Sequence, residues 1–129
     1  MPHARIDLHK VHEPRLAAYS KAILDGMVLG FDMPEDDMFQ SFRLHEPGEL
    51  FYSPTFPNQQ RDDIIFVELV AQVGYTDAQK QAAMGAIADG LAALGVKRDN
   101  VICVTLEVHG AAWYAAESRN PSVVGSGQE

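Results

Sequence analysis

The feature that most constrains the fold is an internal repeat, in which a strand, a helix and a second strand occur twice. These elements are predicted to begin near positions 2, 14 and 38, and again near 65, 77 and 101, so corresponding starts lie 63 residues apart. Each β-α-β unit requires a right-handed crossover and a pair of parallel strands. The sequence therefore predicts an α/β (α+β) fold: a duplicated β-α-β unit that forms a four-stranded mixed sheet with two helices on one face.

The first unit is predicted to contain an amphipathic helix over residues 14–31, after a polar loop over residues 9–13. Pro14 suits the first turn of this helix, where a missing N–H costs nothing. Apolar side chains recur at helical spacing up to Phe31, and Pro34 prevents the helix from continuing.

A short hairpin is predicted to follow the first helix. Residues 38–45 alternate as a strand, and Glu46-Pro47-Gly48-Glu49 has proline and glycine in the central positions of a type II turn. We expect residues 50–53 to fold back as a second strand, and the Pro- and Asn-rich residues 54–63 to be a loop.

The second unit begins with a nearly continuous apolar run over residues 64–71, as expected of a central strand covered on both sides. Thr76 and Gln79 form a capping box for a second helix, Gly95 ends it, and residues 101–107 are another apolar strand. We expect a single domain over 1–129, with units over 1–63 and 64–116 and a frayed tail over 117–129.

The apolar character of the predicted strands suggests that the sheet face without helices is also buried, which predicts an oligomer.

The net charge of −8 argues against binding to nucleic acid or to an anionic membrane surface. The first residues contain no apolar core of signal-peptide length, and no apolar run approaches the length of a membrane span. The single Cys103 cannot form an internal disulfide, so we expect a cytoplasmic protein.

The residues most suggestive of chemistry stand at the start of the chain, where Pro2 follows the initiator methionine. Removal of Met1 would leave a secondary amine, and an α-amino group titrates near pH ~8. Apolar surroundings disfavour the charged ammonium, so this nitrogen could act as a base near neutral pH. The alternative is an ordinary N-terminal proline without a role, as in many proteins that begin Met-Pro.

A duplicated β-α-β unit that begins with Pro2 resembles the tautomerase superfamily, and most closely its malonate semialdehyde decarboxylase branch. The resemblance covers about residues 2–114 and rests on the order and spacing of several short motifs. These are Pro2 with Asp7-Leu8, Phe31-x-x-Pro34-x-x-Asp37-x-Phe39-Gln40, His45-Glu46, Gln79-Lys80 and Trp113. It implies a homotrimer in which each Pro2 is catalytic and lines a pocket near a subunit boundary.

The same resemblance implies roles for two further residues. Asp37 matches a polar partner of the proline that positions or activates water; alternatively it is a loop carboxylate in solvent beside Glu35 and Asp36. Trp113 matches an aromatic wall of the pocket; alternatively it packs in the core or at a subunit interface.

The chain departs from the decarboxylases where they carry an Arg-x-Arg pair that binds the substrate carboxylate. The corresponding residues here are Val73 and Tyr75. A guanidinium can clamp a carboxylate through two hydrogen bonds, which valine and a phenol cannot do. A less cationic pocket would lower the pKa of Pro2, which favours keto–enol tautomerisation of a small 2-keto acid or related carbonyl. Tyr75 would then hydrogen-bond the enolate oxygen, or would simply pack beside the helix cap.

Other readings of the sequence remain open. Arg43 is either a replacement ligand for an anion or an exposed arginine of the hairpin, and Glu107 is either a pocket carboxylate or a surface charge at a strand end. With Arg43 or a neighbouring subunit's arginine, the chain could be a decarboxylase or hydratase.

A third possibility is a non-catalytic binding trimer, in particular if Met1 is retained. His3, His9 and His12 lack further ligands at metal-site spacing, and we expect surface histidines, no metal and no cofactor.

Overall fold

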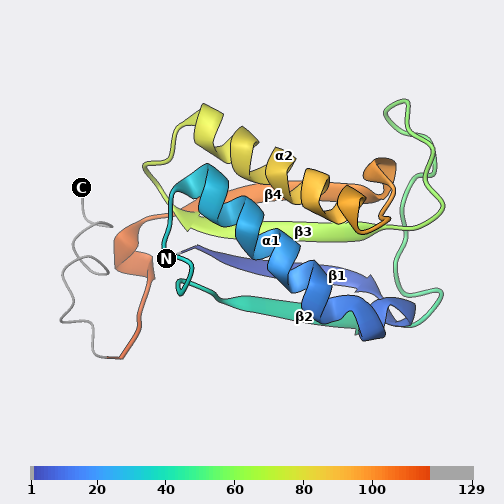
Figure 1. Ribbon diagram of the computed structural model, residues 1–129, viewed down its shortest axis with the longest axis horizontal. Coiled ribbons are helices and arrows are strands. Elements are labelled where there is room, and N and C mark those ends of the chain that lie inside the picture. The colour runs from blue at the N-terminus through green and yellow to red at the C-terminus, as the bar shows by residue number, and fades with distance from the viewer. Residues whose placement is uncertain (1, 117–129) are drawn as a thin grey trace.

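A mixed four-stranded sheet forms one layer of the protein, which a computed structural model describes over residues 2–116 (Figure 1). Its strand order is β2-β1-β3-β4. The outer pairs β1–β2 and β3–β4 are parallel, and the central pair β1–β3 is antiparallel. The duplicated unit predicted from the sequence is therefore confirmed. The strands are β1 (His3–His9), β2 (Gln40–His45), β3 (Ile65–Gln72) and β4 (Val101–Val108).

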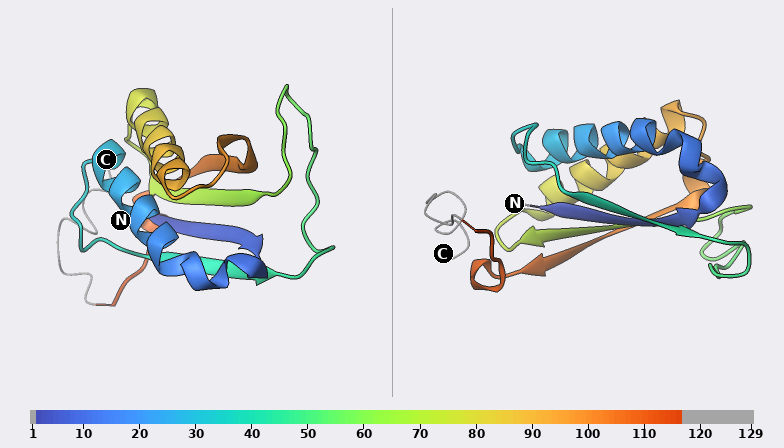
Figure 2. Two further views of the ribbon diagram at one scale, coloured as in Figure 1. Left: turned by 45° about the vertical axis from the view of Figure 1, so that its right-hand side comes forward. Right: turned by 90° about the horizontal axis from the view of Figure 1, so that it is seen from below.

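Two long helices, α1 (Leu16–Phe31) and α2 (Asp77–Ala93), form the second layer. They run antiparallel across the same face of the sheet, and no helix covers the opposite face in the described part of the chain (Figures 1 and 2). Three short 3₁₀-helices complete the elements of residues 2–116: η1 (Lys10–Arg15), η2 (Arg98–Asn100) and η3 (Gly110–Ala112). None of the described helices is both long and apolar enough to cross a membrane.

The core lies between the helices and the sheet. Alternate residues of β1, Ala4, Ile6 and Leu8, point toward the helices and are almost completely buried, which is the two-residue period expected of a strand covered on one side. Burial of large apolar side chains of this kind stabilises a fold by about 1.5–3 kcal/mol each. The other large contributors are Ile65, Val67 and Leu69 from β3, Ile23 and Met27 from α1, and Ile87 and Leu91 from α2.

Several local predictions are confirmed. Thr76 accepts a hydrogen bond from the Gln79 backbone N–H while the Gln79 side chain accepts one from Thr76 N–H, which completes the capping box of α2. Gly95 follows α2 with a positive φ of 94°, as expected after a helix C-terminus. The thiol of Cys103 faces the core side of β4, and burial raises its pKa to about 12, which makes it unreactive.

The predicted hairpin is wrong in its second half. The turn forms, because Glu49 N–H donates to Glu46 O at 3.1 Å and Gly48 has a φ of 90°, but residues 50–53 form no strand. Two-residue hairpins use type I′ or II′ turns, whose twist matches that of the strands, and Pro47 cannot adopt the positive φ that these turns need at its position. The chain therefore leaves the sheet, and Phe51 is 84% exposed.

Two boundaries also differ from the sequence predictions. The expected loop over residues 9–13 is mostly the 3₁₀-helix η1, and α1 starts two residues later than predicted, at Leu16. The predicted tail over 117–129 and the state of Met1 lie outside the described residues.

Candidate active site

At one end of the sheet, the start of β1 lies near the ends of several other elements (Figure 1). The side chain of Pro2 is fully buried there. Because residues alternate along a strand, Pro2 points to the same, helix-covered side as Ala4. A rigid strand therefore holds Pro2 at the end of the core rather than in a free terminal segment.

The loop between α1 and β2 brings Asp37 to this end of the sheet. Helix α1 ends at Asp32 in the left-handed conformation, with a φ of 53°, and Asp37 N–H donates to Pro34 O at 3.1 Å in a tight turn. Ala4 pairs with Gln40 in the parallel register of β1 and β2. Continued back by two residues, this register sets Pro2 beside Met38, the neighbour of Asp37.

The surroundings of Asp37 perturb its carboxyl group. Burial raises the pKa of Asp37 above its ordinary value, and the nearby charge of Asp36 adds to the increase. Asp37 is thus a partly buried carboxyl group in the loop beside the start of β1.

Tyr75 forms an aromatic wall next to Asp37. It lies in the loop before α2, and its ring centroid is 4.5 Å from that of Phe31, the last residue of α1. Burial, and secondarily the charge of Asp37, raise the pKa of the Tyr75 phenol. The hydroxyl is therefore protonated at neutral pH and can donate a hydrogen bond.

Trp113 lies on the other side of the same strand end. It follows η3, and its ring makes an edge contact with His3 at 5.5 Å between centroids. Its indole nitrogen is buried without a hydrogen-bond partner among the described residues. Burial, assisted by the positive charge of Arg5, lowers the pKa of His3. The structure thus places Trp113 against the residue next to Pro2, on the sheet face away from the helices.

Arg43 lies away from this end of the sheet. It pairs across the β1–β2 register with Asp7, and its Nη2 lies 2.9 Å from Asp7 Oδ2. The second oxygen of Asp7 is 2.7 Å from His45 Nε2. Asp7 is five positions from Pro2 along the strand, so Arg43 is engaged elsewhere on the sheet.

The sequence analysis did not find the ion pair that forms beside α2. Lys80 Nζ lies 3.3 Å from Glu107 Oε1 and also 3.3 Å from Asp77 Oδ1. No local spacing signals this contact, because the two residues belong to different elements that only the folded chain brings together.

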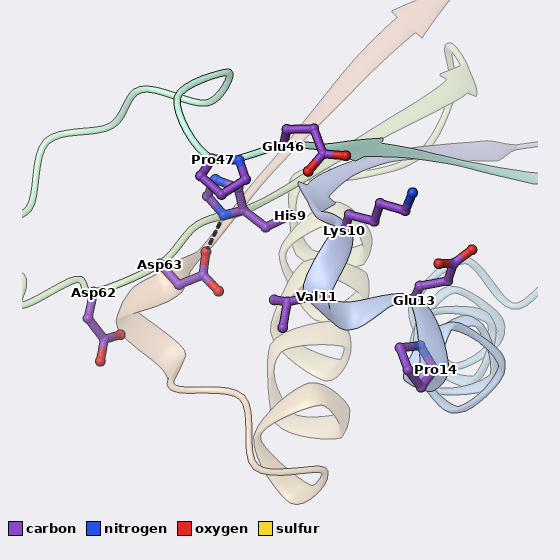
Figure 3. Close-up of a pocket in the computed structure, with 9 residues that line it drawn as sticks. All are labelled: His9, Lys10, Val11, Glu13, Pro14, Glu46, Pro47, Asp62 and Asp63. Atoms are coloured by element: carbon purple, nitrogen blue, oxygen red, sulfur yellow. Dashed lines mark hydrogen bonds and ion pairs between the residues drawn. The ribbon is translucent and has the colours of Figure 1, made fainter.

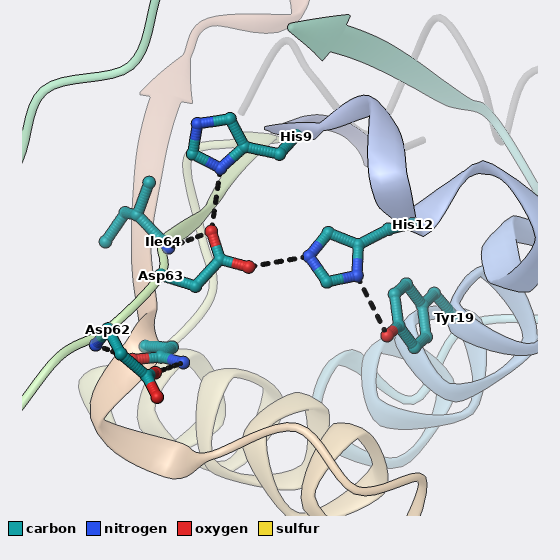
Figure 4. Close-up of polar contacts among 7 residues, drawn as sticks. His9, His12, Tyr19, Asp62, Asp63 and Ile64 are labelled. Atoms are coloured by element: carbon teal, nitrogen blue, oxygen red, sulfur yellow. Dashed lines mark hydrogen bonds and ion pairs between the residues drawn. The ribbon is translucent and has the colours of Figure 1, made fainter. Parts of the chain in front are cut away.

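A separate polar cluster occupies the opposite end of the sheet (Figure 4). The two carboxylate oxygens of Asp63 lie 2.7 Å from His9 Nδ1 and 2.7 Å from His12 Nε2, and Asp63 also accepts a hydrogen bond from Ile64 N–H. His9 and Asp63 line an open cavity of about 680 Å³ with Glu46 and other residues (Figure 3). The prediction of surface histidines is therefore wrong for His9 and His12, which are part-buried and tie the end of β1 and η1 to the loop before β3.

Asp63→Ala is expected to lower the free energy of unfolding by about 2 kcal/mol at neutral pH, because two histidine N–H groups and one backbone N–H lose their acceptor. Burial alone would raise the pKa of Asp63, but the hydrogen bonds from His9, His12 and Ile64 outweigh it and lower the pKa. The stabilisation should therefore be complete above the unfolded-state pKa of about 3.9 and disappear as the pH falls through the lower, folded-state value.

Urea unfolding of the parent and the variant from pH 7 down to pH 3 measures this difference. Asp25→Ala is the matched control, since Asp25 only pairs with exposed Lys21, and it should cost at most about 0.5 kcal/mol. Equal losses in the two variants would show that the Asp63 cluster has no special contribution.

No group of three or more His, Cys, Asp or Glu side chains in residues 2–116 is arranged to hold a metal ion. Pro2, Asp37 and Tyr75 lie at the same end of the sheet, with Trp113 on the opposite face.

Comparison with known proteins identifies the family. Residues 37–114 match a family described as tautomerase enzymes, and the match includes Asp37, Tyr75 and Trp113. The chain belongs to this tautomerase family. It is 33% identical over 104 residues to a probable tautomerase, YusQ, of Bacillus subtilis (strain 168), across 78% of this chain and 82% of that protein.

Solved structures agree with this assignment. The fold is similar to that of FG41 malonate semialdehyde decarboxylase inhibited by 3-bromopropiolate, with 26% identity, 95% of each chain covered and a TM-score of 0.85. It is also similar to a fused 4-OT described as a wild-type symmetric trimer, with 17% identity, 95% of this chain and 98% of that chain covered, and a TM-score of 0.76. The chain is therefore a tautomerase-superfamily member of the malonate semialdehyde decarboxylase-like branch.

Proposed function

We propose that this tautomerase uses the amine of Pro2 as general acid and base in keto–enol proton transfer on a small 2-keto acid or related carbonyl, without a cofactor. The observation that carries the proposal is the burial of Pro2 at the strand end beside Asp37. Apolar burial lowers the pKa of an amine, and a base is most effective when its pKa lies near the working pH.

The proposed reaction moves one proton and leaves the atom count unchanged. The lone pair of the Pro2 nitrogen takes a proton from the carbon next to the carbonyl, a carbon–carbon double bond forms, and the electron pair of the carbonyl moves to oxygen. The phenol of Tyr75 donates a hydrogen bond to this oxygen as its charge develops. Asp37 stabilises the ammonium formed on Pro2, which then returns its proton to the oxygen.

A homotrimer is part of the proposal. The sheet face without helices exposes three apolar side chains of β4: Ile102 is 38%, Val104 46% and Leu106 44% exposed. An apolar face of this kind typically lies at an interface between protein subunits. The symmetric trimer of the similar fused 4-OT supports the same number of subunits here.

Decarboxylation is the alternative raised by the likeness to malonate semialdehyde decarboxylase. It is less well supported, because Val73 and Tyr75 stand where an arginine pair is expected, and because Arg43 lies beside Asp7, five positions along β1 from Pro2. Release of carbon dioxide from malonate semialdehyde by the purified protein would favour this alternative over tautomerisation.

Ketonisation of enol-phenylpyruvate, followed by absorbance, tests the proposal. Two proteins are compared: one shown by intact mass to begin at Pro2, and one with a short N-terminal extension. We expect turnover only with the first, because the extension turns the proline nitrogen into an amide without a basic lone pair. Equal turnover in both proteins would exclude Pro2 as the base, and no turnover by a correctly assembled, unextended protein would exclude the tautomerase activity.

A further inference from the structure

The proposed site needs a cation if its substrate is a keto acid, because the substrate carries a carboxylate. The positions where the resemblance leads one to expect arginines are Val73 and Tyr75. Arg43, the replacement considered from the sequence, pairs with Asp7, which lies five positions along β1 from Pro2 and on the sheet face away from the helices. Lys80, in the first turns of α2, is a cation that the structure places near the same end of the sheet as Pro2.

Strand register places Lys80 relative to Pro2. Glu107 pairs with Ala71 across β3 and β4, and continuing the antiparallel β1–β3 register by one residue sets Ala71 opposite Pro2. The three residues therefore form one row across the sheet. Neighbouring strands are about 4.8 Å apart, so the Cα atoms of Pro2 and Glu107 are separated by roughly 10 Å. Because Lys80 contacts Glu107 from α2, its ammonium lies on the helix-covered side, as Pro2 does.

The environment of Lys80 differs from that of an ordinary surface lysine. Its side chain is 20% exposed, against 76% for Lys21, although both are paired with carboxylates. Hydrogen bonds to Asp77 and Glu107 raise the pKa of Lys80, so the ammonium is charged at neutral pH. The N-terminal end of α2 adds a positive partial charge at the same place.

We infer that Lys80 binds the carboxylate of the substrate, and that this carboxylate replaces Glu107 as the partner of the ammonium. The inference rests on the proposed function and narrows its substrate class to small 2-keto monocarboxylates. Exchange of one carboxylate for another keeps the ammonium paired throughout. Glu107, which is 35% exposed, is then solvated by water at the strand end.

Unreactive probes test the inference independently of proton transfer. NMR titration compares 3-phenylpropionate with its neutral amide, 3-phenylpropanamide. We expect the parent protein to prefer the acid about 10-fold or more, the effect of a charge-assisted hydrogen bond, and Lys80→Gln to abolish this preference. Lys80→Arg should restore most of it. Glu107→Gln should tighten binding of the acid several-fold, which a purely structural ion pair would not do.

The matched control is Lys21→Gln, which removes a paired lysine from the exposed face of α1 and should leave the preference unchanged. The inference is overturned if the parent does not prefer the acid, if Lys80→Gln keeps the preference, or if it weakens acid and amide equally. If Arg43→Gln loses the preference instead, Arg43 on β2 is the cation that binds the carboxylate, and the inference is wrong. A protein that binds the acid through Lys80 but does not ketonise enol-phenylpyruvate would refute the proposed reaction and leave this inference standing.

Discussion

Pro2→Ala is expected to lower kcat/KM for the ketonisation of enol-phenylpyruvate by about 10²–10⁴-fold, the usual contribution of a positioned general acid and base. The alanine amine is not fixed by a ring, so its nitrogen is no longer held in one orientation at the end of β1. It also loses part of the apolar surface that surrounds the buried proline. Steady-state kinetics by absorbance, on protein shown by mass to begin at residue 2, measures the effect.

The control for this experiment is a proline in a different place. Pro14 lies exposed in η1, among residues at the opposite end of β1 from Pro2, and Pro14→Ala should retain parental kcat/KM. A Pro2→Ala protein with unchanged kcat/KM, parental circular dichroism and the parental oligomeric state would contradict the proposed role of Pro2.

The repeat accounts for how much of the fold could be predicted from the sequence. Because each half carries the same strand–helix–strand order, the parallel pairs and the shared helix face follow from general rules of chain connection. The hairpin could not be predicted in the same way, because its second strand depended on the geometry of the turn. Pro47 and Gly48 specify a turn, but one whose twist does not bring residues 50–53 back along β2.

The candidate site was predictable where it depends on the ends of elements. Pro2 immediately precedes β1, and Asp37 and Tyr75 lie in the loops that follow α1 and precede α2, so the topology brings them to one end of the sheet. The ion-pair partners of Arg43 and Lys80 were not predictable, because they depend on strand register and on how far each side chain extends. Register pairs Arg43 with Asp7, while Lys80 reaches from α2 to Glu107 on β4.

Gly30→Ala is expected to lower the free energy of unfolding by about 3 kcal/mol, although alanine is the better helix former by about 0.5–1 kcal/mol. Helices α1 and α2 cross in close contact at Gly26 and Gly30. A Cβ atom on Gly30 would overlap the backbone N and Cα of Ala83, and one on Gly26 would lie 2.7 Å from the backbone N of Ile87. Backbone atoms cannot move aside as a flexible side chain can, so the helices must separate and loosen the core beneath them.

Gly85→Ala is the matched control, because Gly85 is an exposed glycine inside α2 with no atom within 4 Å of an added Cβ. It should raise stability by about 0.5–1 kcal/mol, so the same substitution is expected to have opposite signs in the two helices. Urea unfolding at equal protein concentration measures both, since the stability of the proposed trimer would depend on concentration. A stabilising Gly30→Ala would mean that α1 and α2 are not in direct backbone contact in solution. The layer that closes the core over Pro2 would then be looser than the structure shows.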